Sequence, residues 1–340
     1  MIAKISSRLI YRHSGTDYAT MIRGLAALAV LGVHGGGIYP FLQLASKIGF
    51  GEELAKNFSN LGNAGPAAFF ITSGFVLSLV WEKQCLSGYR KYAIRRYLRL
   101  TPLYLVVLMY CLVVFPEFTL SDLFFRLLYL DAFNESLFLR APISILWTIA
   151  IEFWVSLCIP LFISIFRKIR HPEIVLLCAF LVSALGPVVL ISFGLGDLMA
   201  WKSIPSSVFC FILGSYLSTI QKSRESAKVF KLILVFSLGF MCMYLWNGFM
   251  GAWWLIILLT ASYLGYRRSR LEVTGTPSFL IWLGTICYGV YLLHPIVLAH
   301  IGSQSASWAF YIALIPVLLL ASFSWVFIEK PFSGLFRKVR

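Results

Sequence analysis

Long apolar runs, separated by short polar segments, constrain this chain more than any other feature of its sequence. A helix needs about twenty mostly apolar residues to cross about 30 Å of hydrocarbon. Such runs lie near residues 20–39, 61–81, 98–116, 143–166, 174–194, 205–220, 229–247, 250–266, 279–299 and 307–328. Only 13% of the residues are charged, about half the share of a soluble protein. The sequence therefore predicts an all-α, polytopic membrane helix bundle with about ten transmembrane helices.

The distribution of basic residues predicts the orientation of these spans. Of the 29 Lys and Arg residues, 23 fall in alternate segments that begin with the N-terminus, and five fall in the segments between them. Arg23, at the start of the first span, completes the set. Positive charge favours the cytoplasmic side, so both termini are expected in the cytoplasm. We expect a multi-pass protein of the cell (inner) membrane.

The net charge of +15 would suggest a nucleic-acid partner in a soluble protein. Here the charge clusters between apolar runs, so membrane orientation and membrane lipids explain it, and no nucleic-acid partner is expected. The seven cysteines are scattered, most of them in apolar runs, without a Cys-x-x-Cys pair. They are interpreted as small core residues, and no metal site is predicted.

The longest predicted outer loop, residues 117–142, contains apolar residues at helical spacing. These residues are Leu120, Leu123, Phe124, Leu127 and Leu128. We expect an interfacial or re-entrant helix there, beside the outer mouth of the protein.

Few ionisable residues fall at membrane depth, where they are costly and usually face the protein interior or a wet cavity. They are Arg23, His34, Glu152 and His294. Arg23 and His34 lie eleven residues apart, about three helical turns, so they share one face of the first span. Tyr291 lies one turn from His294. The spans place His34, Glu152 and the Tyr291–His294 pair at similar depth, and we expect these groups to meet in one site. The ordinary alternatives are a bond to a neighbouring helix for His294 and a lipid anchor for Arg23.

Two further segments carry candidate functional residues. Arg96 and Arg99 share a helix face at the cytoplasmic end of the third span, where guanidinium forks suit phosphates; contact with anionic lipid headgroups is the alternative. Ser73, within Phe69–Phe75, is a candidate substrate contact. Its ordinary alternative is a bond to a carbonyl of its own helix.

Taken in order, these motifs resemble the type-three membrane acyltransferases, which O-acylate cell-surface carbohydrates in bacteria. Arg-x10-His stands at Arg23 and His34, and a variant of Phe-Phe-x-x-Ser-Gly-Phe at 69–75. Arg-x-x-Arg stands at Arg96 and Arg99, and a variant of Trp-Ser-Leu-x-x-Glu at 147–152. The last two are Tyr-x-x-Tyr-Leu-x-His at 288–294 and Glu-Lys-Pro at 329–331. Thr72 and Thr148 replace the usual Leu and Ser.

The resemblance implies an O-acyltransferase whose donor is cytoplasmic acyl-CoA, most often acetyl-CoA. The implied acceptor is a sugar hydroxyl of a cell-surface or exported carbohydrate, either free or lipid-linked. By its chemistry His34 is the expected base, and Glu152 would orient it. The donor phosphates would contact Arg23, Arg96 and Arg99. Tyr291, His294 and Ser73 would bind the substrate.

One membrane domain is expected over residues 1–340, without the appended soluble domain that some members of this family carry. Direct transfer and a covalent acyl-histidine intermediate are both compatible with these residues. A proton-coupled transporter of an anionic solute or saccharide is the alternative function, because membrane His and Glu residues also form proton relays.

Overall fold

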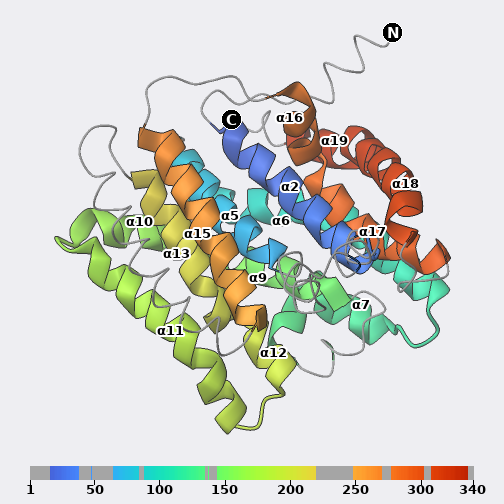
Figure 1. The fold of residues 1–340 in the computed structure, drawn as a ribbon. Coiled ribbons are helices and arrows are strands. Elements are labelled where there is room, and N and C mark those ends of the chain that lie inside the picture. The colour runs from blue at the N-terminus through green and yellow to red at the C-terminus, as the bar shows by residue number, and fades with distance from the viewer. Residues whose placement is uncertain are drawn as a thin grey trace. The chain divides into compact units, whose positions relative to one another are not determined.

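The computed structural model describes residues 16–37, 64–83, 88–134, 144–219, 248–269, 277–301 and 308–335, together with Lys47 and Leu137. Every element in these residues is a helix, as the apolar runs predict (Figure 1). The chain divides into two compact units, one of residues 1–72 and 220–326, and the other of residues 73–219 and 327–340. The predicted span at 229–247 lies outside the described residues.

The first unit is built around α2 (Asp17–His34). Its other helices are α15 (Gly248–Ser269), α16 (Ser278–Thr285), α17 (Cys287–Ile301) and α18 (Ala309–Ser324). All four pack against α2, and α17 also packs along α18. Helix α2 ends at His34, earlier than the apolar run predicts, because Gly35, Gly36 and Gly37 follow it. Gly36 has a φ of 66°, a conformation that glycine adopts without steric cost.

Close packing between α2 and α16 depends on two glycines. A Cβ atom on Gly24 would lie 2.6 Å from the backbone nitrogen of Gly284, and one on Gly284 would overlap the carbonyl oxygen of Thr20. Small residues allow the backbones of membrane helices to approach closely in this way. The contact fixes the position of α2, the helix that carries Arg23 and His34.

Replacing Gly284 with alanine is therefore expected to force α2 and α16 apart and to destabilise the protein by about 1–3 kcal/mol. The melting temperature of the detergent-purified protein measures this effect. Gly334→Ala is the matched control, because a Cβ atom there meets nothing within 4 Å. Equal melting temperatures for the two variants would contradict the assignment of a close contact.

The second unit contains most of the remaining helices. They are α6 (Tyr89–Val114), α7 (Leu120–Leu127), η1 (Leu130–Phe133), η2 (Ser144–Leu146), α9 (Trp147–Leu157), α10 (Ile159–Lys168), α11 (Pro172–Ser192), α12 (Asp197–Trp201), α13 (Ile204–Thr219) and α19 (Lys330–Leu335). Helix α13 packs against α9, α10 and α11, and α6 packs against α7, α9 and α19. Two elements cross the division between the units: α5 (Gly65–Lys83) and the π-helical turn η3 (Trp325–Glu329).

Four of the described helices, α5, α6, α11 and the α18–α19 run, are long and apolar enough to cross a membrane. The count rises to six if each bent pair is one span: α9 with α10, bent by 44°, and α16 with α17, bent by 63°. The protein is a multi-pass membrane protein, whereas the count of ten spans and the cytoplasmic termini stay predictions. Pro160 in the first turn of α10 accounts for the first bend, because proline cannot donate to the preceding helix.

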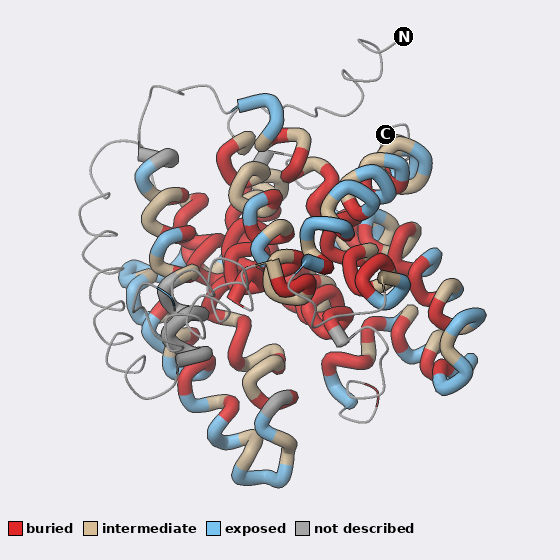
Figure 2. Tube along the Cα trace, turned by 45° about the vertical axis from the view of Figure 1, so that its right-hand side comes forward, coloured by how far each residue is buried: buried red, intermediate tan, exposed pale blue. Residues whose placement is uncertain are grey.

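The exposed faces of these helices are apolar, as lipid contact requires. In the spanning windows, 78% of residues are buried in α5, but only 28% in α11 and 22% in the α18–α19 run. Large apolar side chains such as Leu185, Ile315 and Leu319 are exposed, and Figure 2 shows exposed and buried residues on the same helices. One side of such a helix packs against protein, and its exposed apolar side suits contact with lipid acyl chains.

The predicted helix in the outer loop is present as α7, and its faces are reversed relative to a soluble protein. Leu120 and Phe124 are 71% and 60% exposed, whereas Asp122 and Arg126 are each 2% exposed. Thr119 and Asp122 form a capping box at its start, in which each side chain bonds the backbone N–H of the other residue. A helix with its apolar face outward fits the membrane interface that the sequence predicts for this segment.

Candidate active site

Four of the predicted site residues, Arg23, His34, Tyr291 and His294, lie in the first unit together with Phe69. We call these five residues the histidine cluster. His34 Nδ1 and His294 Nε2 lie 2.8 Å apart. The ring of Tyr291 meets those of His294 and Phe69 edge-on, with centroids 5.9 and 5.6 Å away. The guanidinium of Arg23 lies over the Phe69 ring at 5.9 Å, within cation–π range. Phe69 was not singled out from the sequence, although it opens the motif at 69–75.

The partners of the two imidazoles assign their tautomers. His294 Nδ1 lies 3.1 Å from the carbonyl oxygen of Val290 on its own helix. A carbonyl can only accept, so Nδ1 of His294 carries the hydrogen and Nε2 of a neutral ring carries the lone pair. His34 therefore donates its Nδ1 hydrogen to His294, and in the neutral His34 ring the lone pair is on Nε2. This is the arrangement of a base oriented by a second group.

The position of His34 follows from local structure. It is the last residue of α2, and the glycines after it pack against Phe310, whose N–H donates to the Gly35 carbonyl at 2.7 Å. His294 lies within α17 and is fully buried, while His34 is half-buried. A fixed, buried partner and a more accessible ring suit a base that must meet a substrate.

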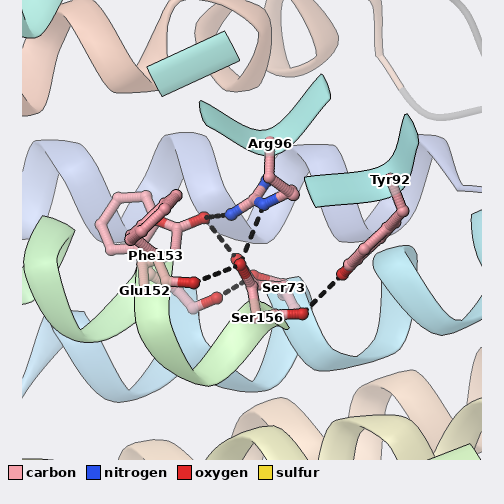
Figure 3. A network of polar contacts seen from close by, with 8 residues as sticks. Ser73, Tyr92, Arg96, Glu152, Phe153 and Ser156 are labelled. Carbon is pink, nitrogen blue, oxygen red and sulfur yellow. Dashed lines mark hydrogen bonds and ion pairs between the residues drawn. The ribbon is translucent and has the colours of Figure 1, made fainter. Parts of the chain in front are cut away.

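A second group, the Arg96–Glu152 cluster, lies in the second unit and contains Ser73, Tyr92, Arg96, Glu152 and Ser156. Arg96 Nη2 donates to Glu152 Oε1 at 3.0 Å, and Ser73 donates to the same oxygen at 3.0 Å. Arg96 Nε donates to Ser156 Oγ at 3.0 Å, and the Tyr92 hydroxyl donates to the Ser156 carbonyl at 2.6 Å. Figure 3 shows these side chains converging from α5, α6 and α9.

This cluster is almost removed from solvent: Arg96 is 4% exposed and Glu152 6%. A buried carboxylate is costly unless it is paired and hydrogen-bonded, and Arg96 and Ser73 meet that requirement. Two predicted ligand contacts, Arg96 and Ser73, are thus engaged with Glu152. Thr72, and not Ser73, makes the predicted bond back to its own helix, to the Ala68 carbonyl at 2.7 Å.

The sequence did not identify Tyr92 and Ser156 as members of this cluster. Each lies four residues from a predicted site residue, Tyr92 before Arg96 and Ser156 after Glu152. That spacing puts the two members of each pair on one helix face, so it could have indicated Tyr92 and Ser156 as neighbours of the predicted site residues. Arg99, predicted beside Arg96, is exposed. The predicted meeting of His34 with Glu152 joins residues of different units and stays a prediction.

Comparison with known proteins identifies relatives over most of the chain. The model of a family described as an acyltransferase domain matches residues 17–328. The chain is 24% identical to the peptidoglycan O-acetyltransferase OatA of Listeria monocytogenes, over 92% of its own length and 56% of that protein. It thus spans little more than half of that relative. No solved structure matches the chain.

Proposed function

We propose, from the premise that this chain belongs to the acyltransferase 3 family, that it transfers an acetyl group from cytoplasmic acetyl-CoA to a hydroxyl of a cell-wall carbohydrate. The family match confirms the resemblance found in the motifs and makes an acyltransferase the class of enzyme. The carbohydrate acceptor is suggested by the name of the Listeria relative. The observation that carries the catalytic part of the proposal is the hydrogen bond between His34 and His294.

His34 acts as the base in this proposal. A sugar hydroxyl is a poor nucleophile at neutral pH, and an imidazole titrates in the range where it can take up the proton. The hydroxyl oxygen forms a bond to the thioester carbonyl carbon while His34 Nε2 takes the hydroxyl proton. The carbon–sulfur bond then breaks, and the same nitrogen returns the proton to the sulfur of coenzyme A. The balance is one ester and one free thiol.

His294 orients the base through its bond to His34 Nδ1. As His34 becomes positively charged, this hydrogen bond becomes charge-assisted and therefore stronger. Tyr291 packs against His294 and is the proposed substrate contact. Arg23 lies over Phe69, which packs against Tyr291, and is a proposed donor contact. Glu152, with Arg96 and Ser73, forms the second element of the proposed machinery. Since His34 Nδ1 bonds His294 and Nε2 takes the proton, the orienting role falls to His294, and the negative charge of Glu152 is proposed to stabilise protonated His34.

Donor phosphates are assigned to Arg99, in the third turn of α6, which is exposed. Arg90 and Lys91, in the first turn of the same helix, are exposed too. Guanidinium groups bind phosphate oxygens in a bidentate manner. Arg96, which the motif pairs with Arg99, is proposed to hold Glu152 instead, because its Nη2 and Nε are both committed within the buried cluster.

The proposed function is tested with membranes from cells with and without the chain. Acetyl-CoA labelled in its acetyl group is supplied to membrane vesicles together with isolated peptidoglycan, and label on the glycan is measured by mass spectrometry. We expect O-acetyl groups only where the chain is present. Flux of a solute without acylation would favour the transporter instead, and label that is equal with and without the chain would overturn the proposal.

Replacing Arg99 with alanine is expected to raise the KM for acetyl-CoA by about three- to tenfold, the effect of losing a partly exposed phosphate contact of about 1 kcal/mol. The kcat should change less than about twofold, because the residue binds the donor equally well throughout the reaction. Initial rates in vesicles at varied acetyl-CoA concentration measure both constants. Lys168→Ala, which removes an exposed charge at the end of α10, is the control. An unchanged KM for Arg99→Ala would return Arg99 to the role of a lipid anchor.

A further inference from the structure

Helix α9, which carries Glu152, is short and needs outside contacts to fix its orientation. It spans eleven residues and ends at the bend before α10. Its polar side bonds Arg96 and Tyr92 on α6. On α9 itself, Phe153 and Trp154 directly follow Glu152, so whatever holds these two aromatic side chains limits how Glu152 can turn.

One residue, Tyr129, contacts both of these aromatic side chains. Its ring stacks on Phe153 at 4.4 Å between centroids with 23° between planes. Its carbonyl oxygen accepts the Trp154 Nε1 hydrogen at 2.9 Å. Stacked aromatic pairs stabilise a contact beyond the area that they bury, and the indole hydrogen bond adds a direction that stacking alone lacks.

Tyr129 is equally tied to α6. The other face of its ring stacks on Tyr104 at 5.1 Å with 19° between planes, and its hydroxyl lies 3.1 Å from Thr101 Oγ1. Tyr97 meets its edge at 6.1 Å. Tyr129 is fully buried and therefore bridges the same two helices that Arg96 and Glu152 join.

The backbone around Tyr129 is built to hold it in place. Tyr129 has a φ of 57°, a left-handed conformation that is unfavourable for a residue other than glycine. Its flanks are anchored by a buried ion pair in which Arg126 Nη1 donates to Asp131 Oδ2 at 3.2 Å. Arg126 also donates to the carbonyl oxygen of Leu137. Burial raises the pKa of Asp131 to about 6, and the neighbouring Arg126 guanidinium opposes the shift.

From this geometry we infer that Tyr129 is a positioning residue, which sets the place of the Glu152 carboxylate by clamping α9 to α6. The inference rests on the proposed function, in which Glu152 belongs to the catalytic machinery. A structural role in the turn alone would be satisfied by the backbone conformation, whereas positioning needs the aromatic ring.

Three substitutions separate these roles. Tyr129→Gly removes the ring but relieves the backbone strain, since glycine adopts this φ freely; we expect a kcat at least about tenfold lower with little change in the KM for acetyl-CoA. Tyr129→Phe keeps the ring and is expected to retain activity within about threefold. Phe124→Ala, which alters an exposed ring on α7, is the control and should have wild-type activity. Wild-type kcat in Tyr129→Gly would overturn the inference.

A double-mutant cycle with Glu152→Gln tests whether Tyr129 acts through Glu152. We expect Tyr129→Gly to lower residual transfer less than about twofold in the Glu152→Gln background, because residues that act as a unit are not additive. Full additivity would contradict the inference. If the wild-type protein transfers no label, the proposed function fails, and the same cycle on melting temperature decides the inference separately. The control residue is Ser183 on α11, which bonds the backbone of Pro205 and Phe209 on α13. Coupling of Tyr129 to Glu152 but not to Ser183 supports the inference, and absence of coupling to Glu152 overturns it.

Discussion

Replacing His34 with alanine is expected to lower acyl transfer by about 10²–10⁴-fold, the loss that follows removal of a general base. The loss should lower kcat, because the proton is transferred in the transition state and not when the substrate binds. Each variant is expressed in cells from which the wild-type chain has been deleted. Mass spectrometry of the purified peptidoglycan then measures the O-acetyl groups. The protein level in the membrane should be unchanged, since His34 is half-buried at a helix end.

Two further variants sharpen this test. His294→Ala removes the partner of His34 Nδ1 and should lower transfer less than His34→Ala does, because the base itself remains. His300→Ala is the matched control: His300 also bonds a carbonyl four residues earlier, that of Ile296 at 2.9 Å, but it is exposed. Normal transfer by His34→Ala protein would exclude His34 from the mechanism, and loss of transfer in the control would indicate general damage to α17.

Replacing Arg96 with methionine is expected to destabilise the protein by about 3–5 kcal/mol and to abolish transfer, because it leaves the Glu152 carboxylate buried without its cation. Adding Glu152→Leu removes the stranded charge, so the double variant should recover most of the melting temperature while transfer stays absent. That separation of stability from activity distinguishes a working carboxylate from a structural ion pair.

The surface of the same unit offers a control for this experiment. Arg167 pairs with Glu82 at 3.4 Å, but its side chain is 59% exposed. Arg167→Met should change stability by less than about 1 kcal/mol, as exposed ion pairs generally do. If Arg96→Met were equally mild, the buried pair would not be part of the stability of the protein, and recovery of transfer in the double variant would exclude Glu152 from catalysis.

The sequence predicted the kind and place of the helices well, because twenty-residue apolar runs and polar breaks leave few alternatives in a membrane. It predicted the α7 helix from spacing alone. It missed the bends after α9 and within the 279–299 run, which depend on how helix ends pack. An apolar run does not by itself set the length of its helix: α13, for example, is helical where predicted but spans sixteen residues.

For the candidate site, the sequence identified residues but not their partners. It gave the depth of His34, Glu152 and His294 along their helices, yet depth leaves the rotation of each helix open. The structure pairs His34 with His294, and Glu152 with Arg96. The role of Tyr129 could not be predicted from the sequence. A left-handed backbone conformation is ordinarily predicted from glycine or asparagine, and this position carries neither.

The reversed faces of α7 change how variants in this segment should be judged. On an ordinary surface helix, a change from leucine to lysine is tolerated and a change at a charged residue is harmless. At Leu120 and Phe124, which are exposed, a charged side chain would be placed against the lipid acyl chains, where charge is costly. At Asp122 and Arg126, even a conservative substitution disturbs buried polar contacts. Scoring schemes calibrated on water-soluble proteins therefore assign tolerance and harm to the wrong sides of this helix.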